Sequence, residues 1–337
     1  MTDSGITAAL EIEKWLREDG QLDAGPARLT PLTGGVSCEI LKVEQGDRKF
    51  VVKRALAKLR VASEWLADVS RNAVEFDFFW TMKDALAGSI PQALFHNPDR
   101  GYFTMEYLEE GWSNWKELLL AGNIDPAHGV LAGTLMGKLH SHSWQDQGLA
   151  KTFDTLENFR QLRMDPYLRT AAKFRPEVRE ELLKEADRIE SCHLCLIHGD
   201  FSPKNLLLKG SRMVLLDAEV ANFGDPSFDV AFLQTHLFLK GLYCAPKSVI
   251  WEETAKSAWD SYCEIMGDRM NETLEKHCAH LLAALMLARV DGKSPVEYLP
   301  APKQDLTRRF AISMLLEKPS TMQAMRTNWS HYLSNFS

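Results

Sequence analysis

One short stretch of the sequence, residues 198–205, places an acid and an amide at the spacing that phosphoryl transfer needs; it reads HGDFSPKN. In this chemistry an acid in a loop accepts the proton of an attacking hydroxyl, and an amide a few residues later holds a magnesium ion. Asp200 and Asn205 fit these two places, and Asp217 fits the place of a second acid that holds magnesium against the phosphates. Each feature alone would be an ordinary surface turn, so the prediction depends on their order and spacing together.

The residues around this motif predict the elements that position it. Two apolar runs, 205–208 and 213–216, read as strands, and the polar residues 209–211 between them read as a turn. Asn205 and Asp217 are therefore expected at the two ends of one hairpin, where both side chains face the same cleft.

The motif resembles the catalytic loop of the aminoglycoside phosphotransferase and choline kinase-like small-molecule kinases. Residues 215–231, LLDAEVANFGDPSFDVA, are similar to the metal-binding segment of that family and the helix after it. The resemblance covers most of the chain and implies an α+β, bilobal, protein-kinase-like fold. We expect a small antiparallel sheet lobe over residues 1–107, which covers the nucleotide, and a mostly helical lobe over 108–337, which carries the catalytic and acceptor-binding residues. ATP and Mg²⁺ are the cofactors that the resemblance implies.

Within that family the chain is most similar to 5-methylthioribose kinases. The similarity rests on the triplet Asp-Ala-Glu at 217–219, on VKRAL at 52–56 and on four single residues: Arg60, Trp65, Arg71 and Glu75. Glu219 is expected to assist the second metal ion or to touch the acceptor. If residues 217–219 are extended, side chains two apart point to the same face and both carboxylates reach the cleft. The alternative is that Glu219 is a solvated turn residue.

The first hundred residues contain the pattern of a nucleotide-covering sheet. Residues 29–43 read as strand, glycine turn and strand, whose backbone N–H groups could lie over phosphates, although a plain hairpin turn has the same pattern. The turn contains the residues that we expect there: Gly34, Gly35 and Ser37. The next strand, 49–53, brings Lys53 to the position that holds the α- and β-phosphates in kinases.

A carboxylate should hold this lysine in place. Residues 71–87 carry apolar side chains at every fourth position, which predicts a helix with one apolar face, and Glu75 lies beside that face. We expect Glu75 to pair with Lys53; the alternative is an exposed acid that pairs with Arg71. A hairpin follows, and the resemblance implies that the residues at its end offer backbone groups to adenine: Glu106, Tyr107 and Leu108.

The resemblance also assigns supporting roles in the second lobe. His198 should brace the catalytic loop by hydrogen bonding, and Asp229 should accept hydrogen bonds from the backbone of that loop. Helices are expected around 251–266, 271–290, 302–317 and 320–335. The acceptor pocket would be built from such helices, and charged residues there could line it or be solvated: Arg289, Asp291, Lys293, Arg308 and Arg309. Trp112 and Trp115 could contact the substrate or pack in the core.

Composition limits the classes of protein that fit. A chain of 337 residues with 45% hydrophobic and 25% charged content can bury one large core or two modest ones. A net charge of -7 without a basic stripe argues against a nucleic-acid partner. The sequence shows neither a membrane-spanning stretch nor a signal peptide, so we expect a cytoplasmic protein. Cys192 and Cys195 could bind zinc or cycle as a dithiol, but free thiols are the simpler interpretation.

The sequence therefore predicts an ATP- and Mg²⁺-dependent kinase that phosphorylates a hydroxyl of a small molecule, such as a thioribose-like or other sugar. Two alternatives stay open: an aminoglycoside or amino-alcohol kinase with a choline- or homoserine-like acceptor, and a non-catalytic nucleotide-binding regulator on the same fold. A protein substrate does not fit, because only a few residues separate Asp217 from the next helix and leave no room for a long activation segment. The preference for ATP over GTP and the oligomeric state are not determined by the sequence.

Overall fold

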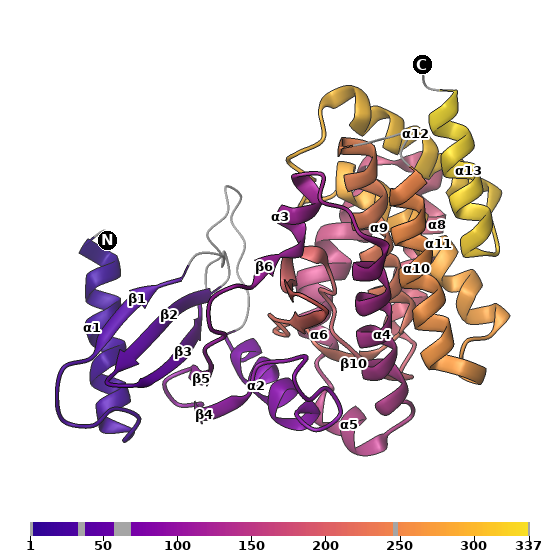
Figure 1. The fold of residues 1–337 in the computed structure, drawn as a ribbon. Helices are drawn as coiled ribbons and strands as arrows, with labels where there is room; N and C mark the ends of the chain where they lie inside the picture. Colours follow the sequence, from indigo (N-terminus) through magenta and orange to yellow (C-terminus); the bar gives the residue numbers. More distant parts are fainter. Residues whose placement is uncertain (1–2, 33–37, 57–68, 245–248, 336–337) are drawn as a thin grey trace. The chain divides into compact units, whose positions relative to one another are not determined.

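The computed structural model describes residues 3–32, 38–56, 69–244 and 249–335 (Figure 1). The chain forms two compact units. The first contains Met1–Thr81 and Pro91–Glu110, and the second contains Met82–Ile90 and Gly111–Ser337. The segment 82–90, which precedes the expected lobe boundary at residue 107, thus belongs to the second unit. The roles of the two parts, nucleotide covering and acceptor binding, remain predictions.

The first unit is built on a five-stranded antiparallel sheet. Its strands follow in spatial order: β1 (Arg28–Pro31), β2 (Cys38–Gln45), β3 (Arg48–Ala55), β5 (Tyr102–Glu106) and β4 (Ala93–Asn97). Neighbouring residues of β5 point to opposite faces, as the strand period of two requires. Tyr102 packs in the cluster that contains Ile12 of helix α1 (Asp3–Glu18), whereas Phe103 contacts Phe76 of helix α2 (Arg71–Met82). The sheet therefore lies between two helices, and α2 carries Glu75.

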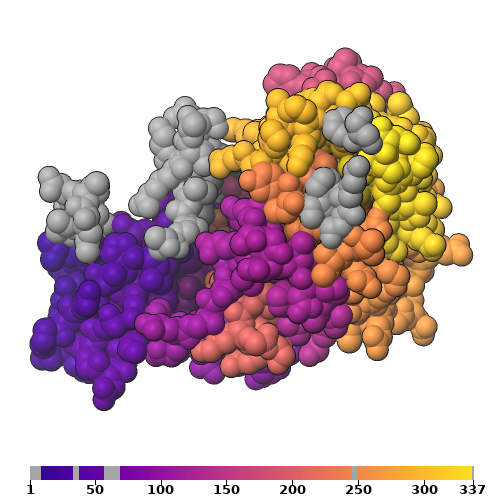
Figure 2. All heavy atoms as spheres, turned by 45° about the horizontal axis from the view of Figure 1, so that its top comes forward, coloured from indigo at the N-terminus to yellow at the C-terminus, as the bar shows by residue number. Residues whose placement is uncertain are grey.

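The second unit is mostly helical. Its helices are α3 (Trp115–Leu120), α4 (Pro126–His142), α5 (Gln147–Thr152), α6 (Leu156–Phe159), α7 (Thr170–Phe174), α8 (Arg179–Glu190), α9 (Ser227–Cys244), α10 (Val249–Met266), α11 (Glu272–Asp291), α12 (Ala301–Glu317) and α13 (Met322–Ser334). A π-helix over Arg160–Arg169 joins α6 to α7. The last four helices lie within a residue or two of the ranges that the sequence predicts, and they appear in orange to yellow in Figures 1 and 2.

Helix α9 is the centre of this unit. Every residue from Ser227 to Leu242 is buried, and α10 and α11 pack against it. Short strands complete the unit: β6 (Ser113–Asn114), β7 (Cys195–Ile197), β8 (Leu206–Lys209), β9 (Arg212–Leu215) and β10 (Asn222–Gly224). Strands β8 and β9 form the predicted hairpin, in which Leu206 pairs with Leu215. None of the helices in the described ranges combines the length and the apolar content of a membrane span.

Candidate active site

The backbone of the loop after β7 is held by one buried acid on α9. Asp229 accepts hydrogen bonds from the backbone N–H groups of His198 (2.7 Å) and Gly199 (2.9 Å). Gly199 has φ +73°, and a Cβ atom there would lie 2.5 Å from the carbonyl oxygen of Val220. Only glycine fits this position, because a side chain would meet both backbone strain and a clash. The loop before Asp200 is therefore held by hydrogen bonds to α9 on one side and packs closely against the backbone of Val220 on the other.

His198 braces the same loop as a neutral ring. Its Nδ1 accepts a hydrogen bond from the backbone N–H of Asp200 (3.2 Å), so the proton lies on Nε2, which donates to the carbonyl of Leu216 (3.0 Å). Burial lowers the pKa of His198 despite the nearby acids Asp229 and Asp200. The ring therefore connects the loop to Leu216, the residue before Asp217. Because it is neutral at neutral pH, it does not act as an acid in the reaction.

Asp200 presents two carboxylate oxygens with different surroundings. Oδ2 is within hydrogen-bond or ion-pair distance of three donors: Lys204 Nζ (2.8 Å), Asn205 Nδ2 (2.9 Å) and Arg163 Nη2 (3.1 Å). Oδ1 has no partner among the described residues. Burial favours the neutral acid, but Arg163 and Lys204 outweigh it, so the pKa of Asp200 lies below its ordinary value. The carboxylate is therefore ionised at neutral pH, and Oδ1 is the oxygen that can receive a hydroxyl.

Arg163 was not predicted from the sequence. It lies on the π-helix, is 7% exposed, and donates from Nε to the carbonyl of Gly199 (2.5 Å) as well as pairing with Asp200. Burial lowers its pKa, but Asp200, Tyr167, Glu219 and the neighbouring acid at 217 together raise it above the ordinary value. π-Helical segments occur often at functional sites, but they follow no apolar period that the sequence would show.

The hairpin brings the two expected magnesium ligands together at its open end. Leu216 donates its backbone N–H to the carbonyl of Asn205 (2.9 Å), so Asp217 follows directly after this contact. Both donor bonds of the Asn205 amide go to Asp200, one to its carbonyl and one to Oδ2. The amide oxygen of Asn205 is thus the atom left for a metal ion, and oxygen is the donor that Mg²⁺ prefers.

Residues 217–219 are not extended, so the condition under which both carboxylates would point to one face is not met. Asp217 has φ +67°, in the left-handed region that non-glycine residues rarely adopt, and Glu219 begins a turn. The backbone turns here because hydrogen bonds hold the residues on both sides, at Leu216 and at Glu219, whose carbonyl accepts from Asn158 Nδ2 (2.7 Å). Glu219 is nevertheless buried, at 7% exposure, and is not a solvated turn residue.

The donor set fits a magnesium ion that is shared with phosphates. No group of three or more His, Cys, Asp or Glu side chains that could hold a metal occurs in the part of the chain that the structure describes. Magnesium usually keeps several waters and is bound by one or two carboxylates together with substrate phosphates. Asn205 and Asp217 match that requirement rather than a site made of protein ligands alone, and the part of Glu219 in it stays a prediction.

In the first unit, Lys53 and Glu75 form a buried ion pair. Lys53 Nζ lies 2.8 Å from Oε1 and 2.6 Å from Oε2 of Glu75, and the residues are 2% and 1% exposed. Asn72, also on α2, donates to the carbonyl of Lys53 (3.1 Å) and fixes the strand against the helix. The helical period thus placed Glu75 next to Lys53, although the contact of Lys53 with phosphates stays a prediction.

The other expected nucleotide-binding residues are placed less fully. Gly34, Gly35 and Ser37 lie outside the described residues. Glu106 ends β5, where its carboxylate accepts from the backbone N–H of Gln92 (3.2 Å). Tyr107 and Leu108 follow in irregular backbone, which leaves the contact with adenine a prediction.

Several other candidates have structural roles. Trp115 is fully buried, and Trp112 lies under the guanidinium of Arg212. Burial raises the pKa of the Cys192 thiol to about 12. It also raises the pKa of Cys195 well above its ordinary value, and both shifts disfavour the thiolate that metal binding or thiol exchange requires.

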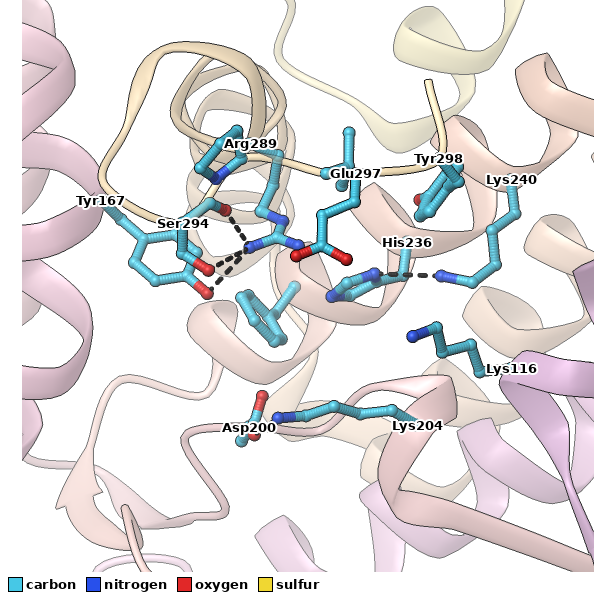
Figure 3. Close-up of a pocket in the computed structure, with 13 residues that line it drawn as sticks. Lys116, Tyr167, Asp200, Lys204, His236, Lys240, Arg289, Ser294, Glu297 and Tyr298 are labelled. Atoms are coloured by element: carbon cyan, nitrogen blue, oxygen red, sulfur yellow. Dashed lines mark hydrogen bonds and ion pairs between the residues drawn. The ribbon is translucent and has the colours of Figure 1, made fainter. Parts of the chain in front are cut away.

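A pocket with a volume of about 230 Å³ opens beside the catalytic loop (Figure 3). It is lined by side chains from α3, the π-helix, the catalytic loop, α9, α11 and the loop after α11: Lys116, Tyr167, Asp200, Lys204, Phe232, His236, Lys240, Arg289, Ser294, Pro295, Val296, Glu297 and Tyr298. All of these residues belong to the second unit. Asp200 therefore lies on the wall of a pocket that could receive an acceptor.

Of the two charged lining residues that follow α9 in the chain, Arg289 and Glu297, only Arg289 was predicted from the sequence. Arg289 lines the pocket, whereas Asp291 is held by Arg175 (2.5 Å) and Arg308 (2.9 Å), and Arg309 pairs with Asp305 (3.0 Å). Lys240 and His236 were missed because α9 reads as an apolar core helix. A usable signal existed: His236 and Lys240 are four residues apart on one face of that helix.

Comparison with known proteins defines the class. Over residues 28–262 the sequence matches the Phosphotransferase enzyme family. The match spans more than half of the chain, and the protein belongs to this family. The sequence has no match among curated proteins.

Solved structures share the fold at low sequence identity. An amicoumacin kinase in complex with AMP-PNP and Ca²⁺ is 11% identical with a TM-score of 0.57, over 95% of this chain and 98% of that one. A putative aminoglycoside phosphotransferase from Ralstonia eutropha is 15% identical with a TM-score of 0.53, over 98% of both chains. An ethanolamine kinase from Plasmodium vivax is 12% identical with a TM-score of 0.53, over 93% of this chain and 87% of that one. The predicted α+β, kinase-like fold is confirmed.

Proposed function

We propose that the protein is an ATP- and Mg²⁺-dependent kinase that moves the γ-phosphoryl group to a hydroxyl of a small molecule. The observation that carries this proposal is Asp200: an ionised carboxylate with one oxygen held by three donors and the other available, on the wall of a pocket. Membership of the Phosphotransferase enzyme family supports the reaction type, and the AMP-PNP bound by the amicoumacin kinase supports an adenine nucleotide.

The surroundings of Asp200 suit orientation of the hydroxyl more than early removal of its proton. A carboxylate with a lowered pKa is a weak base, and the transition state of phosphoryl transfer is loose, so little proton transfer is needed before the new bond forms. Asp200 Oδ1 would accept the hydrogen bond of the acceptor hydroxyl. The proton then passes to the carboxylate late in the reaction.

The remaining residues would hold the nucleotide. Magnesium, when bound, neutralises negative charge on the phosphates, and Asn205 and Asp217 are the residues that would hold it, with assistance from Glu219. Lys53 would steady the α- and β-phosphates, and Glu75 would fix the position of Lys53. The backbone of Gly34, Gly35 and Ser37 would lie over the phosphates. The backbone of Glu106, Tyr107 and Leu108 would contact adenine.

The acceptor should be an uncharged or anionic hydroxylated molecule. Lys116 and Arg289 line the pocket together with Lys240, and the positive charges of Lys116 and Arg289 would repel a cationic aminoglycoside or choline-like acceptor. A thioribose-like or other sugar remains compatible, although no feature of the pocket selects it. All six cysteines are free thiols, which supports a reducing compartment such as the cytoplasm.

An acceptor screen tests the proposal. ADP release from ATP and Mg²⁺ is measured with neutral sugars, sugar acids, amino alcohols and aminoglycosides, using the parent protein and Asp200→Asn. The proposal requires at least one acceptor that raises ADP release in the parent and not in the variant. If ATP binds but no acceptor raises ADP release, the non-catalytic regulator becomes the better interpretation.

A further inference from the structure

Lys240 is a buried lysine without an acidic partner. It is 1% exposed, and its Nζ contacts Nδ1 of His236 (3.2 Å) and the ring of Tyr298 (5.1 Å to the centroid). No carboxylate in the described ranges pairs with it. Burial lowers the pKa of Lys240 well below its ordinary value, and the positive charges of Arg289 and Lys116 lower it further. A buried lysine without an acid is costly whether it keeps its charge or loses its proton, so its retention needs a reason.

Other donors in the same pocket are also unused. Arg289 donates from Nη1 to the carbonyl and hydroxyl of Ser294 and to the hydroxyl of Tyr167 (3.2 Å), but its Nε is buried without a hydrogen-bond partner. The hydroxyl of Tyr298 is buried without a partner as well. Buried polar atoms are nearly always satisfied, so these atoms are free to bond to whatever fills the pocket, water or a ligand. The unused donors at Arg289 and Lys240 require oxygen acceptors.

The charge of the lining points to the sign of that ligand. Four lining residues are basic and two are acidic: Lys116, Lys204, Lys240 and Arg289 against Asp200 and Glu297. Basic side chains therefore outnumber acidic ones by two in this pocket, in a chain whose net charge is -7. Asp200 is already held by Lys204 and Arg163. Glu297 and Lys116 are both exposed, where water screens their charges, so Lys240 and Arg289 are the main basic groups of the pocket.

We propose that the acceptor carries an oxyanion, a carboxylate or a phosphate group, and that Lys240, Arg289 and Lys116 bind it. This inference deepens the proposed function and rests on it only in calling the ligand an acceptor. Figure 3 draws Asp200 and Lys204 on one side of the pocket, and Arg289, His236 and Lys240 on the other. The anionic group would fix one end of the acceptor there and present a hydroxyl to Asp200. At about 230 Å³ the pocket is smaller than the roughly 300–1,000 Å³ of drug-sized sites, so the acceptor is a small molecule.

A binding role and a structural role for Lys240 make opposite predictions for stability. If Lys240 is kept for a ligand, Lys240→Met removes a buried amine that has no acidic partner and leaves the melting temperature equal or higher. If Lys240 supports the fold, the same change lowers the melting temperature. Lys256→Met is the matched control, because Lys256 is an exposed lysine on α10 that pairs with Asp260.

Inorganic sulfate is the probe for the anion site. Sodium sulfate is titrated calorimetrically into the full-length parent, Lys240→Met and Lys256→Met, with sodium chloride keeping the ionic strength constant. We expect the parent and Lys256→Met to bind sulfate equally, and Lys240→Met to bind it at least 10-fold more weakly without loss of thermal stability. Equal affinity in all three proteins, no binding to the parent, or a lower melting temperature of Lys240→Met overturns the proposal.

A matched set of sugars separates this inference from the kinase function. D-Glucuronate, D-glucose and D-glucosamine share a ring but carry an anion, no charge and a cation, and ADP release is measured with each. The inference expects any activity in the set to be highest with glucuronate and to fall at least 10-fold in Lys240→Met. Activity that is highest with glucosamine leaves the kinase function intact and overturns the anion site. If sulfate binds as expected but no acceptor in a broader anionic screen raises ADP release, the anion site stands and the kinase function fails.

Discussion

Arg163 and Asp200 form a buried ion pair, with 3.1 Å between Nη2 and Oδ2, and the same arginine donates to the carbonyl of Gly199. One side chain from the π-helix thus fixes both the carboxylate and the backbone of the catalytic loop. Because Lys204 contacts the same oxygen, Oδ1 of Asp200 remains for the acceptor.

The first prediction concerns the pH dependence of activity. Asp200 must be ionised to receive a hydroxyl, and its folded pKa lies below the ordinary value because Arg163 and Lys204 outweigh burial. In Arg163→Met one of the two cations that offset the effect of burial is gone, so the pKa of Asp200 rises. The acidic limb of the kcat/KM profile then moves to higher pH. Arg160→Met is the control, since Arg160 pairs with Glu157 and Glu190 instead. An acidic limb at the parental pH in Arg163→Met contradicts the assignment.

The second prediction separates stability from nucleotide binding at Lys53 and Glu75. Lys53→Met removes the lysine that neutralises a buried carboxylate, and we expect the free energy of unfolding to fall by about 3–5 kcal/mol. In Lys53→Met/Glu75→Leu the carboxylate is also gone, so most of that stability should return while ATP affinity stays low. Urea unfolding and ATP titration measure the two effects. Recovery of ATP affinity in the double variant would show that Lys53 does not contact the nucleotide.

The third prediction distinguishes Asp217 from Glu219. Asp217→Ala should abolish activity with every acceptor, because the charge of the triphosphate must be neutralised whichever molecule is phosphorylated. Glu219→Gln, which keeps the size of this buried side chain, should raise the Mg²⁺ requirement or the KM of the acceptor while nucleotide binding persists. Parental kinetics of Glu219→Gln across Mg²⁺ and acceptor titrations would remove Glu219 from the site.

The fourth prediction uses two glycines in the left-handed region. Gly199 and Gly210 have φ +73° and +58°, but only at Gly199 would a Cβ atom meet another atom, the carbonyl oxygen of Val220 at 2.5 Å. Gly210→Ala should therefore cost about 1–2 kcal/mol of unfolding free energy and leave kcat unchanged. Gly199→Ala should cost more and lower kcat, because Asp200 moves with the loop. Equal losses of stability and equal kcat values in the two variants would contradict this account of the loop.

The sequence predicted the parts of the site that lie close together along the chain. The apolar runs placed Asn205 and Asp217 at the ends of one hairpin, and the helical period placed Glu75 beside Lys53. Arg163 could not be found in this way, because it reaches Asp200 from 37 positions away on a segment without a regular period. The sequence left the backbone at 217–219 open, because tertiary hydrogen bonds set its conformation.

Lys240 shows a second reason why the sequence alone does not predict the whole site. A lysine in an apolar helix is visible in the sequence, but whether an acid lies opposite depends on α3, α11 and the loop after α11, which only the fold brings together. The composition of the whole chain also misleads about this pocket, since the chain has a net charge of -7 while basic residues outnumber acidic ones in the lining.

The most direct test of the central claim follows the phosphoryl group itself by ³¹P NMR. ATP, Mg²⁺ and an acceptor found in the screen are incubated with the parent protein and with Asp200→Asn, and the acceptor is omitted in a third sample. We predict a new phosphomonoester signal and equal ADP with the parent, a rate lower by roughly 10² to 10⁴ with Asp200→Asn, and no such signal without acceptor. A phosphomonoester that forms at the parental rate with Asp200→Asn would contradict the assignment of Asp200 as the residue that receives the acceptor hydroxyl.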